Sequence, residues 1–395
     1  MSARDGARRV LATYRDSGAL WTASLVAERV LPSLVRRLWR DVPVDADTLA
    51  AQVAAILRAW TVSDADAAII VEHLLWADLH GIDSHGCAML RAYQRDLDAG
   101  AWTPHAVVEV VHESATTALV DGGGGLGHVP SDTAIKLAVA KCAAHGVAAV
   151  AVRNSGHFGA AGAYAALAAR AGMIGLATTG TRVPAVVPTF GVAAMLGTNP
   201  IAFAAPAARN APFLLDMATS TAPLGKLALA AHRGRAIPRG WALDRRGRAE
   251  TNAHRAVAQR RLTPLGSTHA HGSHKGYGLA TMVEILSAVL PGIRAGRGFP
   301  APPDGVGHFF LALDPARFRP DGGFAADVDA LLDGLRATPP CDAAQSVRVA
   351  GDPEYAAEAE RRRAGIPLAR AVVEDIRHVA RAAGAPFLLD ASRRS

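Results

Sequence analysis

The sequence predicts an α/β protein in which helices cover a mixed or parallel sheet. Half of its 395 residues are apolar, which is enough to build a large buried core. Between residues 117 and 178, apolar segments of strand length alternate with segments of helical length, and glycines close the helices. These observations favour an α/β core, with helical segments before and after it.

In the first part of the chain, the capping residues and the spacing of apolar residues predict helices. Ser63 is a suitable N-cap because it directly precedes a segment whose apolar residues recur at helical spacing. We expect residues 44–120 to form a helical domain that packs with the C-terminal helices and carries the loop Ser84-His85-Gly86. Residues 1–43 stand apart as an atypical N-terminal extension. The helices predicted in this part are Asp45–Ala59, Ser63–Leu79 and Cys87–Asp98.

The alternating segments predict a cofactor-binding α/β domain over residues 121–315, followed by a C-terminal helical segment over residues 316–395. The predicted strands are Thr117–Val120, Val147–Val152, Ile174–Thr178, Pro200–Ala205, Pro212–Asp216 and Phe309–Leu313. The predicted helices are Ser131–Ala144, Ala160–Ala171, Lys275–Leu290, Pro353–Ala364 and Arg370–Ala383.

Composition excludes several classes of partner. The net charge is +7, but the arginines are scattered and have no aromatic platform among them, so we expect no nucleic acid. The longest uncharged run, Val183–Ala208, holds four prolines and predicts buried strands and turns, not a membrane span. No signal peptide is apparent, so we expect a cytoplasmic protein. The segment Leu20–Trp39 is interpreted either as a membrane-surface or partner helix or, as we favour, as an extension packed on the protein itself.

A glycine-rich turn, Gly122–Gly127, contains G-x-G-x-x-G between a predicted strand and a predicted helix. That is the context of a dinucleotide-binding turn of the Rossmann type. Four consecutive glycines also satisfy the pattern by chance, so a plain flexible turn is an equal alternative.

Two histidine loops carry the candidate chemistry. Ser84 beside His85 can form a proton relay, and histidine has a pKa suited to delivering a proton near neutrality. His157 follows a buried strand and opens a helix, where a cofactor phosphate could also bind. Each has an ordinary structural alternative: a capping residue beside an unremarkable histidine for the first, and a buried histidine bonded to a carbonyl for the second.

Further polar residues lie in turns or next to glycines. Thr198 and Asn199 can hold a carboxylate or carbonyl oxygen, and Asp216 ends a strand where ribose hydroxyls could bind. Lys275 is one of few lysines and could reach an anionic group, although a lysine in such a position is more often a solvated surface charge. We expect no metal site, because the three cysteines form no C-x-x-C pair and because the cluster His269, His271 and His274 fits a loop better than a metal site.

As a set, these motifs resemble the malate/L-lactate dehydrogenase-like family, which includes ureidoglycolate, sulfolactate and diketogulonate dehydrogenases and piperideine-2-carboxylate reductase. The resemblance runs from about Val44 to Leu368, in the same order throughout. The motifs that carry it are Asp83–Gly86, Val120–Gly122, Leu126–Gly127, His145–Val147, Ser155–Gly159, Gly197–Pro200, Leu215–Ser220, Gly240–Asp244, Lys275–Leu279 and Gly365–Leu368.

The resemblance implies an NAD(P)-dependent oxidoreductase that moves a hydride between nicotinamide and a small 2-oxo or 2-hydroxy acid or a cyclic imino acid. It implies a non-Rossmann NAD(P)-binding fold, so that Gly122–Gly127 is not the cofactor turn, and a homodimer. The catalytic residues that it implies are Ser84, His85 and His157, and the substrate contacts are Thr198 and Asn199. The cofactor contacts, for NAD or NADP, are Phe158, Gly159, Ala160, Thr181, Asp216, Met217, Ala218 and Lys275, with the segment Gly351–Glu360 nearby.

Two departures from the family pattern concern the substrate. Met89 stands where the family usually has an arginine that clamps the substrate carboxylate, and methionine offers no donor. Arg91, two residues on, points about 200° round a helix from that position. Gly180 stands where asparagine is common. The alternative is therefore a divergent, catalytically impaired homologue that still binds the cofactor.

Overall fold

The computed structural model describes residues 41–390 apart from residues 233 and 294–304. The helix predicted over Leu20–Trp39, and most of the extension that contains it, lie outside the described residues. Within the described chain, the main sheet has seven strands in the order β2-β3-β4-β10-β5-β6-β7. Its strands are β2 (Glu109–Glu113), β3 (Thr117–Asp121), β4 (Val147–Ser155), β5 (Ile174–Thr179), β6 (Ile201–Ala205), β7 (Phe213–Met217) and β10 (Val306–Leu313).

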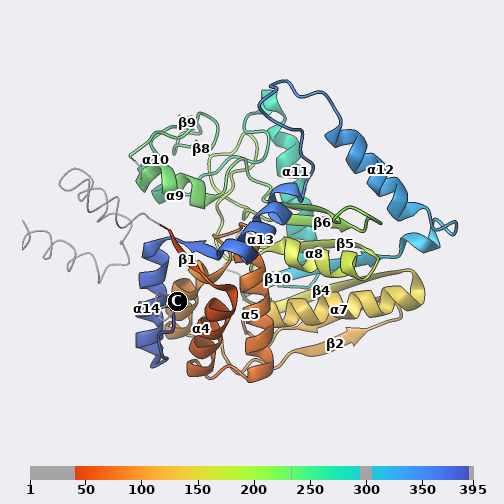
Figure 1. Cartoon of the computed structure of the whole chain (residues 1–395). Helices are drawn as coiled ribbons and strands as arrows, with labels where there is room; N and C mark the ends of the chain where they lie inside the picture. The colour runs from red at the N-terminus through yellow and green to blue at the C-terminus, as the bar shows by residue number, and fades with distance from the viewer. Residues whose placement is uncertain (1–40, 233, 294–304, 391–395) are drawn as a thin grey trace, which may run out of the picture.

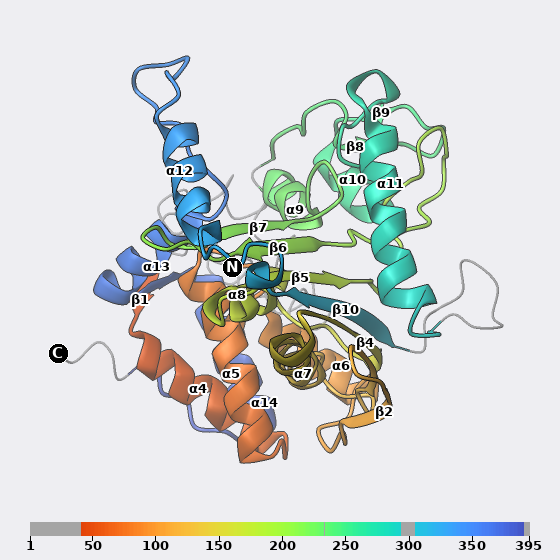
Figure 2. The same cartoon turned by 90° about the vertical axis from the view of Figure 1, so that its right-hand side faces the viewer.

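The sheet is mixed, as predicted. In its described part β3 and β4 are the one parallel pair, and the other neighbours run antiparallel. Helices α7 (His128–His145) and α8 (Ala161–Arg170) pack along the sheet (Figure 2). Helix α11 (Ser273–Glu284) continues into a π-helical turn, η3 (Ile285–Val289), which contacts β4, β5 and β10 and is tied to β5 by the hydroxyls of Thr178 and Ser287, 2.7 Å apart. The central strands are therefore covered by helical segments.

A helical layer carries the Ser84–His85 loop. It combines helices from both ends of the chain, and α14 packs against α4 and α6 (Figure 1). The side chain of Asp45 caps α4, and the side chain of Ser63 caps α5. The cap at Ser63 was predicted from the sequence. The members of this layer are α4 (Ala46–Ala59), α5 (Asp64–Leu79), the 3₁₀ turn η1 (Cys87–Met89), α6 (Leu90–Asp98), α14 (Arg370–Ala383), and the paired strands β1 (Val42–Val44) and β11 (Ile366–Leu368).

Some elements differ from the prediction. The sheet begins at Glu109, so β2 and β3 belong to it and not to the helical unit expected over residues 44–120. Strand β2 was not predicted, because all five of its residues are exposed and show no apolar alternation. The helix predicted over Lys275–Leu290 begins two residues earlier, and its last turn is π-helical.

A smaller apolar core lies beside the main sheet, within the region predicted as residues 121–315. It includes Leu227, Ile237 and Leu262. Its elements had no predicted bounds: α9 (Leu224–His232), β8 (Ala242–Leu243), β9 (Ala249–Glu250) and α10 (Ala253–Gln259). The remaining helical segments are η2 (His269–His271), η4 (Pro315–Arg317), α12 (Phe324–Arg336) and α13 (Asp352–Ala364). No helix in the described part of the chain combines the length and apolarity needed to cross a bilayer.

Candidate active site

The loop between α5 and η1 holds Ser84 beside His85. The Ser84 hydroxyl lies 2.8 Å from Nδ1 of His85, so the predicted hydrogen-bonded pair is present. The buried carboxylate of Asp78 fixes the turn that follows, because it accepts a hydrogen bond from the Cys87 backbone N–H at 2.8 Å. A Cβ at Gly86 would lie 1.9 Å from the Asp78 carboxylate, so only glycine fits there.

Asp83, the residue before Ser84, has its partner in a distant helix. It neither orients His85 nor caps the next helix, but pairs with the guanidinium of Arg361 in α13. The same guanidinium donates to the backbone carbonyl of Asp78. The loop is therefore held from one side by a buried carboxylate and from the other by a C-terminal helix.

His157 lies just beyond β4, and its ring is fixed by two hydrogen bonds to one atom. Nδ1 accepts from the Gly159 backbone N–H at 3.3 Å and lies 2.8 Å from the Tyr93 hydroxyl. An N–H can only donate, so Nδ1 of the neutral ring is the acceptor and Nε2 carries the proton. Tyr93 comes from the buried face of α6. The ring is thus presented as a proton donor at Nε2.

The two histidine loops meet. The rings of His85 and His157 stack with their centroids 5.5 Å apart, although 71 positions of sequence separate them. Burial, followed by the nearby charge that His85 would carry, lowers the pKa of His157 to about 3, and burial lowers the pKa of His85 as well. Both rings are therefore neutral near pH 7, and a bound carboxylate beside them would favour protonation.

The Gly122–Gly127 turn is a scaffold for this site. Its N–H groups at Gly122, Gly124 and Gly127 donate to carbonyl oxygens within Arg153–His157 at 2.9, 2.8 and 3.0 Å. A cofactor phosphate would need free donors. The Rossmann interpretation of this turn is therefore wrong, and the turn instead supports the backbone that carries His157.

The predicted cofactor residues Phe158–Ala160 and Asp216 meet at the start of α8. Asp216 Oδ2 accepts from the Gly162 backbone N–H at 2.7 Å, and burial raises the pKa of Asp216 to about 6. Phe158 is fully buried and stacks on His308 at 4.6 Å, so it supports the loop from beneath. A half-buried carboxylate with one further oxygen suits ribose hydroxyls, so these residues fit a nicotinamide dinucleotide. Met217 and Ala218 follow Asp216 and are half-buried.

Thr181 lies against the Gly197-Thr198 turn, since a Cβ at Gly197 would lie 1.8 Å from the Thr181 hydroxyl. Thr198 is half-buried. Asn199, by contrast, is fully buried, and its amide donates to the backbone of Ala280 and to Glu284, both at 2.9 Å. The geometry gives Asn199 a role in holding β6 to α11 in place of the predicted direct contact with substrate.

Lys275 is exposed in the first turn of α11, and within the described residues it makes no hydrogen bond or ion pair with the histidine pair. The rings of His269 and His274 lie 5.4 Å apart, and the described residues contain no group of three or more side chains arranged to hold a metal ion.

Met89 and Gly180 are the two positions that depart from the family pattern. Met89 packs against the apolar core of the helical layer, and a Cβ at Gly180 would meet open space. Arg91 is paired with Asp375 at 2.9 Å and so is committed elsewhere.

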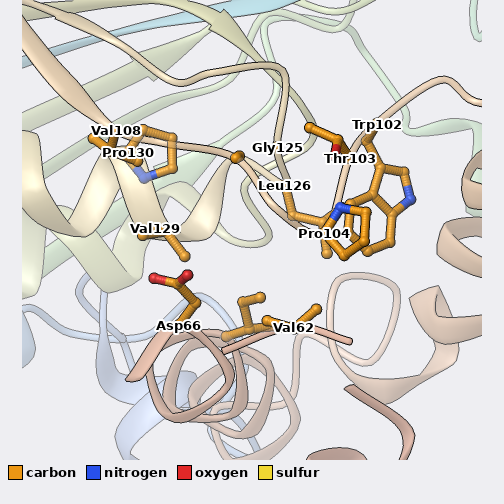
Figure 3. Close-up of a pocket in the computed structure, with 12 residues that line it drawn as sticks. Val62, Asp66, Trp102, Thr103, Pro104, Val108, Gly125, Leu126, Val129 and Pro130 are labelled. Carbon is orange, nitrogen blue, oxygen red and sulfur yellow. The ribbon is translucent and has the colours of Figure 1, made fainter. Parts of the chain in front are cut away.

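A small cavity lies apart from this site (Figure 3). It measures about 20 Å³ and is lined mainly by apolar side chains, with Asp66 at one side and Leu126 and Pro130 at the other. That is room for about one water molecule, so it cannot hold a dinucleotide.

The decisive comparison is with protein families. The malate/L-lactate dehydrogenase family matches residues 44–377. The chain belongs to this family. The match covers both histidine loops, the Thr198 turn and Asp216, so the resemblance seen in the sequence is confirmed.

Individual relatives lead to the same family. Malate dehydrogenase of Pyrococcus horikoshii is 36% identical over 345 residues, which are 86% of this chain and 95% of that protein. Its solved structure superposes with a TM-score of 0.78 over 88% of this chain and 97% of that one, at 35% identity. The (2R)-3-sulfolactate dehydrogenase (NADP(+)) of Chromohalobacter salexigens is 33% identical over 84% of this chain and 96% of its own length.

The solved structure of delta1-piperideine-2-carboxylate reductase from Pseudomonas syringae is also similar. Its TM-score is 0.74 at 28% identity, over 86% of this chain and all of that one. The predicted non-Rossmann family fold is thus confirmed. The chain is an NAD(P)-dependent oxidoreductase of this family, and the catalytically impaired alternative is not favoured.

Sequence reasoning missed two residues that the site depends on. Tyr93 could have been found from its spacing, because it lies three residues after Leu90 on the apolar face of a predicted helix near His85. Asp78 had a weaker signal: a carboxylate among the last apolar residues of a buried helix, where an unpaired charge is costly.

Proposed function

We propose that His157 is the proton-transferring residue of a reversible reduction of a small 2-oxo acid or cyclic imino acid, with Ser84 and His85 as its relay. The observation that carries the proposal is the stacking of the two histidine rings at 5.5 Å, with the proton of His157 held on Nε2. A carbonyl or imine that accepts a hydride also needs one proton, and a fixed imidazole N–H beside it can supply that proton.

The residues of the chain move the proton in a defined order. His157 gives its Nε2 proton to the substrate oxygen or nitrogen, while the Tyr93 hydroxyl at 2.8 Å can follow toward Nδ1 so that the imidazole does not become an anion. Ser84 is exposed and bonds His85, so this pair reaches solvent. In the oxidation direction the same atoms accept the proton.

The cofactor would be held by Asp216, by the backbone at Phe158–Ala160 and by Thr181, with Met217, Ala218 and Lys275 as further contacts. When bound, the nicotinamide supplies or takes up the hydride. Asp216 would accept from ribose hydroxyls with the oxygen that Gly162 does not use. Both NAD and NADP fit this proposal, and NADP(+) is in the name of one relative.

The substrate would contact Thr198, whose half-buried hydroxyl lies in the turn against Thr181. An arginine clamp is not available at Met89, and Arg91 is paired with Asp375. We therefore expect a substrate whose carboxylate is recognised by hydroxyl and backbone donors, which favours a compact 2-oxo acid or cyclic imine over a dicarboxylate.

We also propose that the protein is a cytoplasmic homodimer. The outer face of α11 and η3 presents Met282, Ile285, Val289 and Leu290, whose exposed fractions are 37, 52, 58 and 58%. A continuous apolar face of this kind is typical of a surface that another subunit covers. Sedimentation at micromolar concentration should give twice the mass of the chain, whereas Ile285→Asp together with Val289→Asp should give the single mass.

The proposed function is tested by following NADH and NADPH oxidation with a panel of 2-oxo acids and cyclic imines. We expect turnover with at least one compact member, and a loss of at least ~100-fold in His157→Gln, the usual scale for losing a general acid. Cofactor binding, measured by nicotinamide fluorescence, should survive the substitution.

The matched control is His105→Gln, a histidine on the surface segment before β2. It should leave turnover unchanged. Turnover close to wild type in His157→Gln would remove His157 from the reaction, and inactivity of the wild type across the whole panel would contradict the proposed function itself.

A further inference from the structure

The C-terminal end of α5 is completed by an arginine from a distant part of the chain. The last carbonyl groups of a helix have no partner within the helix, and the helix dipole favours a cation at this end. The last turn of α5 contains no basic residue of its own. Arg361 in α13 supplies the cation, because its Nη1 donates to the backbone carbonyl of Asp78. The Arg361 side chain is only 14% exposed, so this contact is largely shielded from water.

The same guanidinium holds Asp83, the residue directly before Ser84. Its Nη1 donates to Oδ1 of Asp83, and its Nη2 lies 3.4 Å from Oδ2. Two nitrogens of one planar group thus face both oxygens of one carboxylate, an arrangement that fixes orientation as well as distance. Asp83 is 61% exposed, so water screens the attraction between the charges. The pair is therefore better suited to fixing the geometry of the loop than to adding much stability.

Two more contacts define the loop that carries the relay. Gly81 has a φ of +80°, and a Cβ there would lie 3.3 Å from the Cβ of Ala357, so the loop starts against α13. The loop ends where the Cys87 N–H donates to the Asp78 carboxylate at 2.8 Å. The stretch in between contains the Ser84–His85 hydrogen bond, and the Arg361 guanidinium supports it from the side of α13.

We propose that Arg361 is a positioning residue, which holds the Ser84–His85 relay at the place beside His157 where it can exchange a proton. This role rests on the proposed function, since holding the relay matters for the rate only if the relay handles a proton. The contacts of Arg361 are with Asp83 and the end of α5, so it acts on the reacting atoms through the loop. Proton transfer requires heavy atoms within hydrogen-bond reach, so a loop displacement of about 1 Å is enough to slow it.

The N-terminal end of α13 contacts the strand that carries the predicted cofactor residue Asp216. The Leu214 N–H donates to the Ala350 carbonyl at 3.3 Å, and a Cβ at Gly351 would lie 3.3 Å from the Cβ of Leu214. Leu214 lies two residues before Asp216 on β7. Figure 1 shows α13 beside the end of α5. Displacement of the whole helix would therefore disturb both cofactor binding and the relay, whereas loss of the Arg361 contacts alone would disturb only the relay.

The test compares Arg361→Gln with Arg363→Gln in the enzyme supplied with cofactor and substrate. Arg363 is the matched control, because it lies in the same helix, is 73% exposed and pairs with Glu360. Arg361→Gln should lower kcat about tenfold while the cofactor dissociation constant stays within about twofold of wild type. Arg363→Gln should change neither quantity. This split between kcat and cofactor affinity separates a positioning role from a general loosening of α13.

Two further variants test the contact itself. Arg361→Lys keeps the charge but loses the planar pair of donors, so its kcat should lie between those of wild type and Arg361→Gln. Asp83→Asn removes the carboxylate that the guanidinium holds and should also lower kcat. Because both residues act through one contact, the double variant Asp83→Asn with Arg361→Gln should be about as slow as Arg361→Gln alone.

A readout without turnover is amide hydrogen exchange at His85, whose N–H donates to the Ile82 carbonyl at 2.9 Å. This amide should exchange about tenfold faster in Arg361→Gln and at the wild-type rate in Arg363→Gln. Unchanged kcat, unchanged exchange, or a cofactor affinity that falls in step with kcat would overturn the positioning role. An inactive wild type would contradict the proposed function alone, because the exchange rates still decide whether Arg361 holds the loop. If Arg361→Gln does not fold, Arg361→Lys and Asp83→Asn decide it.

Discussion

Two neighbouring strand-to-helix connections both contain glycines and differ in what their backbones do. One, Gly122–Gly127, leads from β3 to α7, and the other, Arg153–Ala160, leads from β4 to α8, on the one parallel strand pair of the described sheet. The first has the pattern of a nucleotide-binding turn, yet its N–H groups are donated to the second. The second presents His157 and meets Asp216. The comparison teaches that a glycine pattern marks a phosphate site only where its backbone donors remain free.

The largest expected effect tests the scaffold role of the first connection. A Cβ at Gly127 would lie 2.4 Å from the backbone oxygen of Gly156, and backbone cannot turn aside as a side chain can. Gly127→Ala should therefore destabilise the protein by about 3 kcal/mol or prevent folding, as measured by thermal and urea denaturation. Gly124→Ala, whose Cβ would lie no closer than 3.7 Å to another atom, should cost only about 1 kcal/mol for its left-handed φ of +75°. Equal stability in the two variants would contradict the scaffold role.

The next effect separates the two connections as cofactor sites. Asp216→Asn should weaken cofactor binding about tenfold, because a charged acceptor for ribose hydroxyls is lost. Gly124→Ala should leave the dissociation constant unchanged, since the Gly124 N–H is already donated to the Asn154 carbonyl. Fluorescence titration with NADH and NADPH measures both. A Rossmann-type turn would give the reverse pattern.

The smallest effect concerns pH. The pKa of His157 in the folded protein is lowered to about 3, so the unfolded chain binds a proton that the folded chain does not as pH falls below about 6.5. The stability that the neutral His157 ring contributes is complete above that pH and is lost on acidification. The His157→Gln variant has no ring to protonate, so it does not show this loss. Between pH 7.5 and pH 5, the free energy of unfolding measured by urea denaturation should fall by about 1 kcal/mol more in wild type than in the variant, after allowance for the partial exposure of the ring. An equal loss in both would contradict the buried neutral state.

Much of the fold could be predicted from the sequence where a pattern is local. Ser63 caps its helix, Gly146 closes α7, and the alternating segments around residues 117–178 are strands and helices as expected. The sequence missed β2, because an exposed strand without apolar alternation is specified by its pairing with β3. It also gave no hint that the last turn of the long helix is π-helical.

The candidate site was predicted in part. His85 and His157 were expected to meet, and their rings do. Tyr93 and Asp78 were not identified: their spacing puts both on buried parts of helices, but their roles depend on partners in space, a nitrogen of His157 for Tyr93 and the Cys87 N–H for Asp78. Asn199 was expected at the substrate, but its amide is used by α11, a partner about 80 residues away that no local pattern indicates.

The central claim is that the two histidine loops form one proton-handling unit, and a double-mutant cycle on kcat tests it most directly. His85→Gln, His157→Gln and the double variant are compared with wild type at fixed pH and saturating substrate. Groups that act as a unit are strongly non-additive. We predict that the double variant is about as slow as His157→Gln alone. Losses that multiply, as for two independent groups, would contradict the account.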